Sequence, residues 1–287
     1  MRILVRRSGA LGDVVLTTPV IRRLRRENPD AEIGVQTAFT GIFNNSPHRL
    51  LVTNQNPMPY PWSPEGGLDR LIDLDLAYEK RPTMHIVQAY MQEAFGDTGA
   101  PEDLHQEMFF KPVEPWGGSK RVVAVHAAKA GWRNRTLPEA TWLKVVKLLQ
   151  DEGCFPILVG SMKDALPAAK CASFHSGDIM QQAAMIARCR CFIGSDSGLL
   201  HVAGATQTPI VGVFTSVMPA YRLPWRHGTQ GWNCASVMPN LDCVGCVARQ
   251  PIPTNVETCE RGDIACTGMV SAETIVDMAV HLIEEVG

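Results

Sequence analysis

Apolar runs and amphipathic segments alternate along the chain. The apolar runs of the first half predict strands at 2–6, 31–37 and 69–78. Helical spacing follows the first of these strands as far as residue 28 and recurs over 83–95. Pro19 leaves two interpretations open: a helix that starts there with Thr18 as its N-cap, or an earlier first turn that is kinked at this point. The proline-rich stretch 40–67 predicts irregular chain.

The alternation restarts in the second half after residues 97–120, which hold glycine, proline and charge and predict a linker. The predicted strands are 121–126, 155–160, 190–194 and 209–214, and the predicted helices are 137–153, 163–170, 178–189, 197–205 and 272–285. Strands and helices in this order predict an α/β fold, with a parallel sheet covered by helices on both faces. We therefore expect two Rossmann-like domains, residues 1–115 and residues 116–287, the second ending in a cysteine-rich loop (243–266) and a final helix.

Composition narrows the class of protein. The 287 residues carry a formal net charge of −2, which argues against bulk nucleic-acid binding. The sequence has no apolar run of membrane-spanning length, and its N-terminus does not resemble a signal peptide. We expect a cytoplasmic protein with no transmembrane segment and no nucleic-acid partner.

The turn after the first predicted strand, Ser8-Gly9-Ala10-Leu11-Gly12, ends in Asp13. Glycine-rich turns at this position commonly cradle phosphate, which a carboxylate repels. The turn matches neither G-x-G-x-x-G nor the Walker sequence, so we do not expect the nucleotide in the first domain. Asp13 either caps a helix, where the helix dipole favours a carboxylate, or serves as a general base that faces an interdomain cleft.

A second turn, "SDSGLLH" at 195–201, follows a predicted strand of the second half. Asp196 and Ser197 are good N-cap residues, and Gly198 lets the backbone approach a ligand. His201 lies one helical turn further on and can reach a phosphate or sugar bound there. The alternative is an ordinary capped helix with a packed histidine.

A third turn, "HAAKAGWRNRTLP" at 126–138, carries Lys129, Arg133 and Arg135 ahead of a helix that opens near Pro138. Cations beside a helix start at the top of a parallel sheet are typical of a diphosphate clamp. An exposed basic loop is the alternative. The arginines Arg6, Arg7, Arg22, Arg23, Arg25 and Arg26 leave a similar choice between a phosphorylated acceptor and a solvated surface.

Taken in order, "GALGDVVLTTPVIRRLRRENPDAEI" (9–33), residues 135–138 and "GSDSGLLHVAGATQTPIVGVF" (194–214) resemble glycosyltransferase family 9. This family includes the ADP-heptose:lipopolysaccharide heptosyltransferases. The resemblance implies a GT-B type fold, in which two Rossmann-like domains face a cleft. It places the acceptor on the N-terminal domain and the nucleotide-sugar donor on the C-terminal one.

The resemblance also implies roles for individual residues. Asp13 falls at the position of the catalytic base, which deprotonates the acceptor hydroxyl for an inverting transfer that requires no metal. Gly9 and Gly12 then lie on the acceptor side and make room for that hydroxyl. The donor-binding positions are Lys129, Arg135, Thr136, Asp196, Ser197, Gly198 and His201. The chain departs from the family pattern at Ala127, Ala128 and Leu137, and Asp164 is a candidate for the donor ribose or base.

Four cysteines crowd one stretch at the end of the second half: Cys243, Cys246, Cys259 and Cys266. Four soft ligands suit zinc or iron, and we expect any such site to be structural. One branch of related heptosyltransferases, which modifies autotransporter proteins, is known for a four-cysteine iron site, and this stretch resembles that branch. Free thiols and disulfides are the alternatives, although a reducing cytoplasm disfavours disulfides.

Together these features predict an inverting glycosyltransferase. It would move a heptose-type sugar from a nucleotide-diphosphate donor, ADP in the resembling family, to a lipopolysaccharide-like saccharide or a protein acceptor. An acceptor of the first kind implies peripheral membrane contact. The alternatives are a nucleotide-sugar epimerase on a similar fold and a non-catalytic protein that binds nucleotide sugars or supports assembly.

Overall fold

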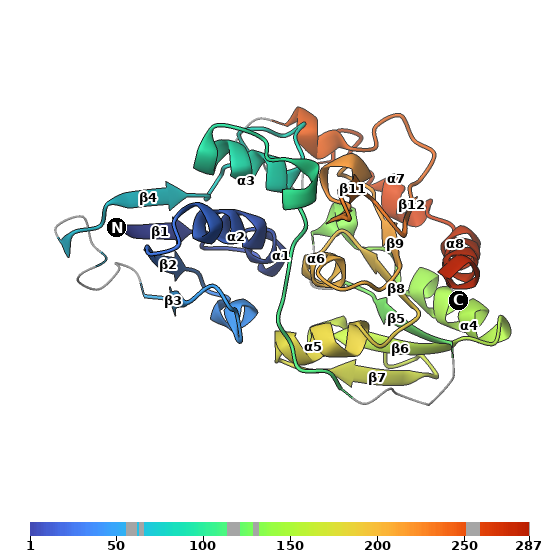
Figure 1. The fold of residues 1–287 in the computed structure, drawn as a ribbon. Coiled ribbons are helices and arrows are strands. Elements are labelled where there is room, and N and C mark those ends of the chain that lie inside the picture. The colour runs from blue at the N-terminus through green and yellow to red at the C-terminus, as the bar shows by residue number, and fades with distance from the viewer. Residues whose placement is uncertain (56–61, 63–65, 114–120, 129–131, 251–258, 287) are drawn as a thin grey trace.

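The chain folds into two α/β units, each built on its own parallel sheet (Figure 1). The computed structural model describes residues 1–55, 62, 66–113, 121–128, 132–250 and 259–286. Four strands form the first sheet in the order β3-β2-β1-β4, and six form the second in the order β12-β9-β8-β5-β6-β7. The second order is that of a doubly wound Rossmann sheet. The expected α/β fold with two Rossmann-like sheets is confirmed.

The first unit places β1 at the centre of its sheet, in parallel register with β2 and β4. Its elements are β1 (Arg2–Arg6), α1 (Leu11–Val15), α2 (Thr18–Glu27), β2 (Glu32–Gln36), η1 (Thr40–Phe43), β3 (Leu50–Thr53), β4 (Arg70–Asp73), α3 (Ile86–Phe95) and η3 (Pro101–Asp103). Two expectations were wrong here. The stretch 40–67 contains the strand β3, and the strand expected over 69–78 is only β4, because the chain turns from Leu74 onward.

The helix after β1 is broken before Pro19, so the interpretation with an earlier first turn is correct. α1 ends at Val15, and α2 begins with Thr17, not Thr18, as its N-cap residue. The Thr17 and Thr18 hydroxyls donate to the carbonyls of Val14 and Val15, each at 2.8 Å. These bonds satisfy carbonyls that the break leaves without helical partners.

The second unit follows the predicted alternation closely. Its elements are β5 (Val122–His126), η4 (Arg133–Arg135), α4 (Glu139–Asp151), β6 (Phe155–Gly160), η5 (Met162–Asp164), β7 (Ala172–His175), α5 (Ile179–Ile186), β8 (Cys191–Ser195), α6 (Gly198–Gly204), β9 (Ile210–Val213), η6 (Pro219–Tyr221), β10 (Trp225–Arg226), β11 (Thr229–Gln230), β12 (Cys234–Val237), η7 (Cys246–Arg249), α7 (Ala265–Gly268) and α8 (Ala272–Val286). The helix expected at 163–170 was wrong: Ser161 and Asp164 close a single 3₁₀ turn as a capping box, and the chain continues into β7. The edge strands β7 and β12 were not predicted.

Two clusters of buried apolar side chains form the core. One joins the first sheet, α2 and α3 to the α5–α6 face of the second sheet. The other lies between the opposite face of the second sheet and the helices α4 and α8. Helices therefore cover both faces of the second sheet, as expected. On the first sheet, Leu51 and Leu71 point away from the core and are 45% and 47% exposed, so packing among the described residues does not close that face.

Residues 97–113 of the predicted linker run between the two units and are hydrogen-bonded to both (Figure 1). The Glu107 N–H donates to Thr18 Oγ1 at 2.9 Å in the first unit. The Gln106 amide donates to the carbonyl of His201 at 3.3 Å in the second. The expected domain boundary at 115/116 lies outside the described residues and stays a prediction.

Candidate active site

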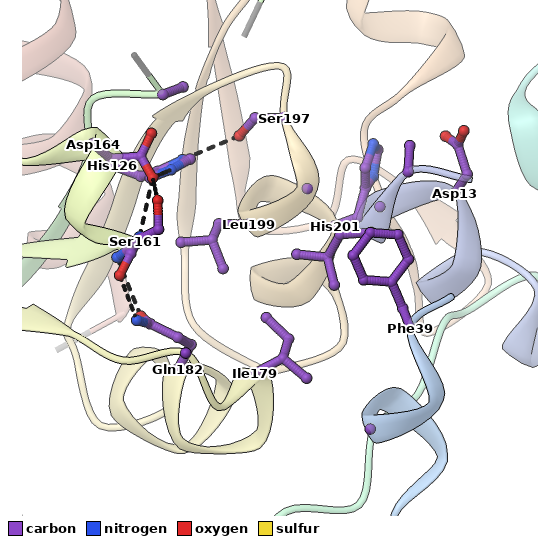
Figure 2. Close-up of a pocket in the computed structure, with 18 of the residues that line it drawn as sticks. Asp13, Phe39, His126, Ser161, Asp164, Ile179, Gln182, Ser197, Leu199 and His201 are labelled. Atoms are coloured by element: carbon purple, nitrogen blue, oxygen red, sulfur yellow. Dashed lines mark hydrogen bonds and ion pairs between the residues drawn. The ribbon is translucent and has the colours of Figure 1, made fainter. Parts of the chain in front are cut away.

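A cavity of about 770 Å³ lies between the two units, at the carboxyl ends of the strands of both sheets. This is where open α/β sheets bind ligands. From the first unit it is lined by residues 10–13 after β1 and 38–41 after β2. From the second it is lined by turns that follow β5, β6, β7 and β8. Figure 2 shows Asp13, Phe39 and His201 at one side of this cavity and His126, Ser161 and Asp164 at the other.

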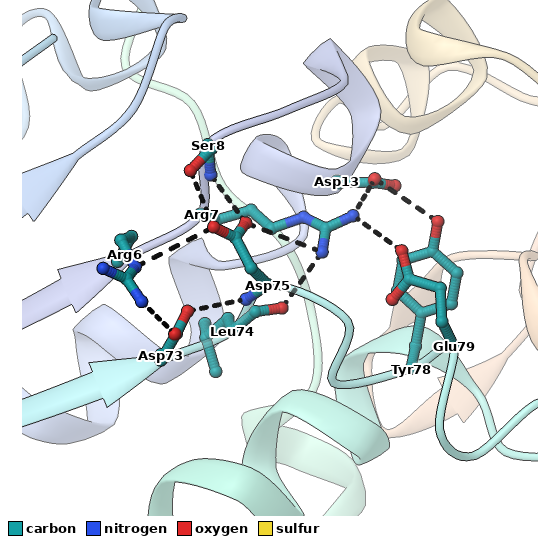
Figure 3. A network of polar contacts seen from close by, with 9 residues as sticks. All are labelled: Arg6, Arg7, Ser8, Asp13, Asp73, Leu74, Asp75, Tyr78 and Glu79. Atoms are coloured by element: carbon teal, nitrogen blue, oxygen red, sulfur yellow. Dashed lines mark hydrogen bonds and ion pairs between the residues drawn. The ribbon is translucent and has the colours of Figure 1, made fainter. Parts of the chain in front are cut away.

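Asp13 lines the cavity and does not cap its helix. The N-cap position of α1 is Ala10, and no side chain caps this helix end. The Asp13 carboxylate instead accepts hydrogen bonds from Arg7 and from the Tyr78 hydroxyl, the latter at 3.4 Å (Figure 3). It is 8% exposed. Burial raises the pKa of Asp13, and the charge of Arg7 opposes this rise.

Gly12 and Gly198 meet where the two units touch. A Cβ on Gly12 would lie 2.5 Å from His201 Cδ2 and 3.2 Å from the Gly198 Cα. A Cβ on Gly198 would lie 2.9 Å from a methyl carbon of Leu11. We expected Gly198 to admit a ligand and Gly12 to admit the acceptor hydroxyl. Instead of a ligand, each glycine has a helix of the other unit beside it: α6 lies against Gly12, and α1 lies against Gly198. Gly9, in contrast, has open space around its Cα.

Replacing Gly12 by Ala is therefore expected to destabilise the contact between the units. His201 is 4% exposed and has little room to move. Overpacking of this kind costs about 1–3 kcal/mol of the free energy of unfolding, which a melting curve measures. Gly9→Ala is the matched control in the same turn and is expected to change stability by less than about 0.5 kcal/mol. Equal melting temperatures for the two variants would contradict the close contact.

Asp196, in the cavity wall, lies close to three basic side chains. Its carboxylate lies 3.1 Å from Arg135, 3.8 Å from Arg222 and 3.9 Å from His201. Burial acts to raise the pKa of Asp196, but these neighbours together lower it, so the carboxylate is held ionised. Burial lowers the pKa of His201 to about 4, so its imidazole is neutral at pH 7.

Arg222 is a site residue that the sequence analysis missed. Its guanidinium lies near Asp196 and 5.1 Å from the centre of the Tyr78 ring, so it joins the walls of the two units. It belongs to no motif, and only the folded chain brings it next to Asp196, which lines the cavity. His126 was also passed over, although its place at the end of a predicted strand was a usable signal.

His126 connects two turns of the second unit. Its Nδ1 lies 3.1 Å from the Ser197 hydroxyl, and its Nε2 lies 3.6 Å from Asp164 Oδ2 (Figure 2). The same Asp164 oxygen accepts hydrogen bonds from the backbone N–H and hydroxyl of Ser161, at 3.0 and 2.7 Å. Asp164 thus orients both its own turn and His126. Its Oδ2 already has these partners and is not available as an acceptor for a donor ribose.

The basic turn before α4 lies behind the cavity wall. The Arg135 guanidinium packs 3.9 Å from the centre of the Trp132 ring, and Trp132 lines the cavity. The Thr136 hydroxyl donates to the carbonyl of Trp132 at 2.9 Å, within its own turn. Lys129 lies outside the described residues. Of the positions expected to bind the donor, Asp196, Ser197, Gly198 and His201 line the cavity directly.

The arginines of α2 are paired inside the first unit. Arg23 and Arg26 each make two hydrogen bonds to a carboxylate, of Asp97 and Asp103 respectively. Arg22 pairs with Glu107 at 2.9 Å. These pairs favour the interpretation as a surface helix over that of an acceptor-phosphate site.

The four clustered cysteines line one small cavity behind the basic turn, next to Asn134 and Thr215. All four are free thiols. Burial raises the pKa of Cys266 to about 11, and the other three cysteines add to the rise because they are close. Within the described ranges, however, no three His, Cys, Asp or Glu side chains are arranged to hold a metal ion. The donor set, four thiols that line one cavity, suits zinc or iron.

Comparison with known proteins bears on this site. A family model described as glycosyltransferase family 9 (heptosyltransferase) matches residues 74–244, more than half of the chain. The chain belongs to glycosyltransferase family 9. The matched range includes the cavity wall of the second unit, whereas Asp13 precedes it. As for membranes, no described helix of this family 9 protein is long and apolar enough to cross one.

Two curated relatives are lipopolysaccharide heptosyltransferases 2. The protein of Salmonella typhimurium LT2 is 31% identical over 220 residues, which cover 67% of this chain and 60% of the relative. The protein of Escherichia coli K12 is 32% identical over 103 residues, 31% of this chain and 30% of the relative. The chain therefore aligns with less than two thirds of the length of either relative.

Solved structures show that the fold is shared. The iron-containing dodecameric glycosyltransferase TibC of enterotoxigenic E. coli H10407 matches with a TM-score of 0.76 at 13% identity, over 99% of this chain and 78% of that one. E. coli ADP-heptose lipopolysaccharide heptosyltransferase II matches with a TM-score of 0.63 at 17% identity, over 99% of both chains. The expected GT-B architecture of this family 9 protein is thereby confirmed.

Proposed function

We propose that this protein is an inverting glycosyltransferase that moves a heptose-type sugar from an ADP-linked donor to a saccharide or protein acceptor. The observation that carries the proposal is that Asp13 from the first unit and the 196–201 turn from the second unit line one cavity. Membership of family 9 supports it. So do related structures determined with ADP-D-beta-D-heptose, for TibC, and with ADP, for E. coli WaaC.

In this mechanism the Asp13 carboxylate takes the proton of the acceptor hydroxyl. The hydroxyl oxygen then bonds to the anomeric carbon from the side opposite the diphosphate. The bond between that carbon and the diphosphate oxygen breaks, and its electron pair leaves with the diphosphate. Burial strengthens Asp13 as a base because it disfavours the charged form that Asp13 must give up.

The leaving diphosphate is assigned to the second unit. The Ser197 hydroxyl and the His201 imidazole face the cavity and are the groups placed to donate hydrogen bonds to it. Arg135 supplies positive charge beside Asp196, with Thr136 and Gly198 shaping the two turns, and Lys129 stays assigned to the donor by the family resemblance alone. The acceptor binds beside Gly9 and Asp13. A lipopolysaccharide-like acceptor would bring the enzyme to a membrane surface from the cytoplasm.

A panel of nucleotides tests the donor class. ADP, UDP, GDP and NAD are compared by thermal shift, and donor turnover is then measured with the sugar nucleotide of the best binder. ADP is expected to give the largest rise in melting temperature. A preference for NAD, or ADP binding without turnover of any ADP-sugar in the presence of acceptor, would overturn the proposal.

We further propose that the four cysteines take up a structural zinc or iron ion. They line one cavity against Asn134 and Thr215, and the Thr215 hydroxyl bonds to the Asn134 carbonyl in the turn that carries Arg135. A metal bound there would brace this turn. No catalytic step is assigned to it.

Cys243→Ser is expected to reduce the metal content of the purified protein and to lower its melting temperature, because one of four ligands is lost. Elemental analysis and a melting curve measure the two effects. Cys171→Ser, outside the cluster, serves as the control. Wild-type protein without metal, or a Cys243→Ser variant with unchanged metal and melting temperature, would refute the proposed site.

A further inference from the structure

Arg7 is a buried cation between two carboxylates at the acceptor side of the cavity. It ends the buried stretch that begins in β1, and its side chain is 7% exposed. Its Nη1 donates to the Leu74 carbonyl at 3.0 Å, which anchors one end of the guanidinium (Figure 3). Its Nη2 donates to both Asp13 and Glu79, the latter at 3.2 Å. One nitrogen therefore serves two acceptors.

We infer that Arg7 is a positioning residue that holds Asp13 ionised at the cavity wall, and that Glu79 competes with Asp13 for the stabilising positive charge of the same guanidinium. This inference rests on the proposed role of Asp13 as the base. It adds a pair of residues that tunes the base: Arg7 favours its charged form, and Glu79 weakens that effect.

The surroundings of Asp13 make this competition effective. Asp13 is buried, so it has little solvent to stabilise its charge and depends on neighbouring groups. The neighbours from its own unit are Arg7, Tyr78, Glu79 and Tyr90, and the charges of Arg222 and Arg135 act on it from the second unit. Asp75 lies further off, 3.9 Å from the anchored Nη1.

The two aromatic rings explain why Arg7 stays in place. The guanidinium carbon lies 5.2 Å from the centre of the Tyr78 ring and 5.9 Å from that of Tyr90. Both distances fit cation–π contacts. Glu79 is 19% exposed on its side chain and is more accessible to solvent than Asp13, at 12%. Glu79→Gln keeps the size of this side chain and removes only its charge.

Opposite pH shifts distinguish this tuning from a purely structural role. Without the Glu79 charge, Arg7 acts on Asp13 alone and lowers the pKa of Asp13. Without Arg7, the largest effect that opposes burial is lost, and that pKa rises further. Since a base must be ionised to accept a proton, activity falls as the pH drops through its pKa. The acid limb of the kcat/KM profile follows the pKa in each case.

The experiment compares full-length Glu79→Gln and Arg7→Met enzymes with wild type. We expect the acid limb to move to lower pH in Glu79→Gln and to higher pH in Arg7→Met, each by about one unit. Arg7→Lys restores the charge and is expected to return the limb most of the way. Glu93→Gln, which removes a carboxylate paired with Arg81 on the surface, is the control and is expected to leave the limb in place.

A second readout does not depend on the reaction. The pKa of Asp13 is measured by NMR of 13C-labelled aspartate carboxyls, with its signal assigned by its loss in Asp13→Asn. Opposite shifts of that pKa in an inactive protein would uphold the tuning while the proposed function fails. Shifts in the same direction, or none, would overturn it; if Arg7→Met does not fold, an unmoved pKa in Glu79→Gln alone is enough to do so.

Discussion

Replacing Asp13 by Asn is expected to lower kcat by a factor of about 10²–10⁴ and to leave ADP affinity nearly unchanged. An amide has the size of the carboxylate and keeps the Tyr78 contact, but it cannot accept the acceptor proton. Arg7 retains Glu79 and the Leu74 carbonyl as partners, so the variant leaves no buried cation without a neighbour. The fold is therefore expected to survive.

Initial rates with saturating donor and acceptor measure the first effect, and calorimetric titration with ADP measures the second. A melting curve checks that Asp13→Asn is folded. Glu93→Gln, a charge-removing change elsewhere on the first unit, is expected to keep wild-type turnover. Normal turnover in Asp13→Asn would refute the assignment of the base, and parallel loss of turnover and ADP binding would point to a structural role.

Replacing Arg135 by Met is expected to reduce the free energy of unfolding by about 3–5 kcal/mol and to weaken ADP binding. The change removes the nearest partner of the buried Asp196 and leaves that carboxylate with Arg222 and His201 at longer distances. Removing one partner of a buried ion pair lowers the free energy of unfolding by about this amount, because the other charge is left buried without compensation. The pKa of Asp196 is expected to rise, because Arg135 is the strongest of the charges that lower it.

Urea unfolding and calorimetric titration with ADP measure these effects. Arg133→Met, an exposed arginine of the same turn, is the matched control, with an expected change below about 0.5 kcal/mol. The double variant Arg135→Met/Asp196→Asn also removes the carboxylate charge that Arg135→Met leaves without its nearest partner. It is expected to recover part of the lost stability. An ADP affinity equal to wild type in a folded Arg135→Met would remove Arg135 from the donor site.

Most elements that the sequence predicted correctly carry their signal within one continuous stretch of chain. The buried runs of β1, β5, β6, β8 and β9 are largely apolar, and α4 and α8 are long amphipathic helices. Local periodicity is enough to predict such elements, and their alternation implies parallel sheets. The turn that carries Asp13 was visible because glycine and a carboxylate directly follow a strand.

The elements that the sequence analysis missed lack that local signal. β3 and β7 are four-residue edge strands with no fully buried side chain, and β12 has only one. The helix expected at 163–170 failed because a capping box stops the turn after three residues. Short, half-exposed strands form because a neighbouring strand offers hydrogen bonds, and that neighbour is distant in sequence.

The sequence by itself determined the α/β class, the two Rossmann-like units and the turns that hold Asp13 and Asp196, because short-range patterns of apolar, glycine and charged residues specify these features. Only the tertiary structure decided what each site residue faces. Gly12 packs against His201, and Arg222 lies over the Tyr78 ring. One nitrogen of Arg7 donates hydrogen bonds to both Asp13 and Glu79. Such contacts join residues far apart in the chain, or depend on how a buried side chain turns, and local pattern carries no information about either.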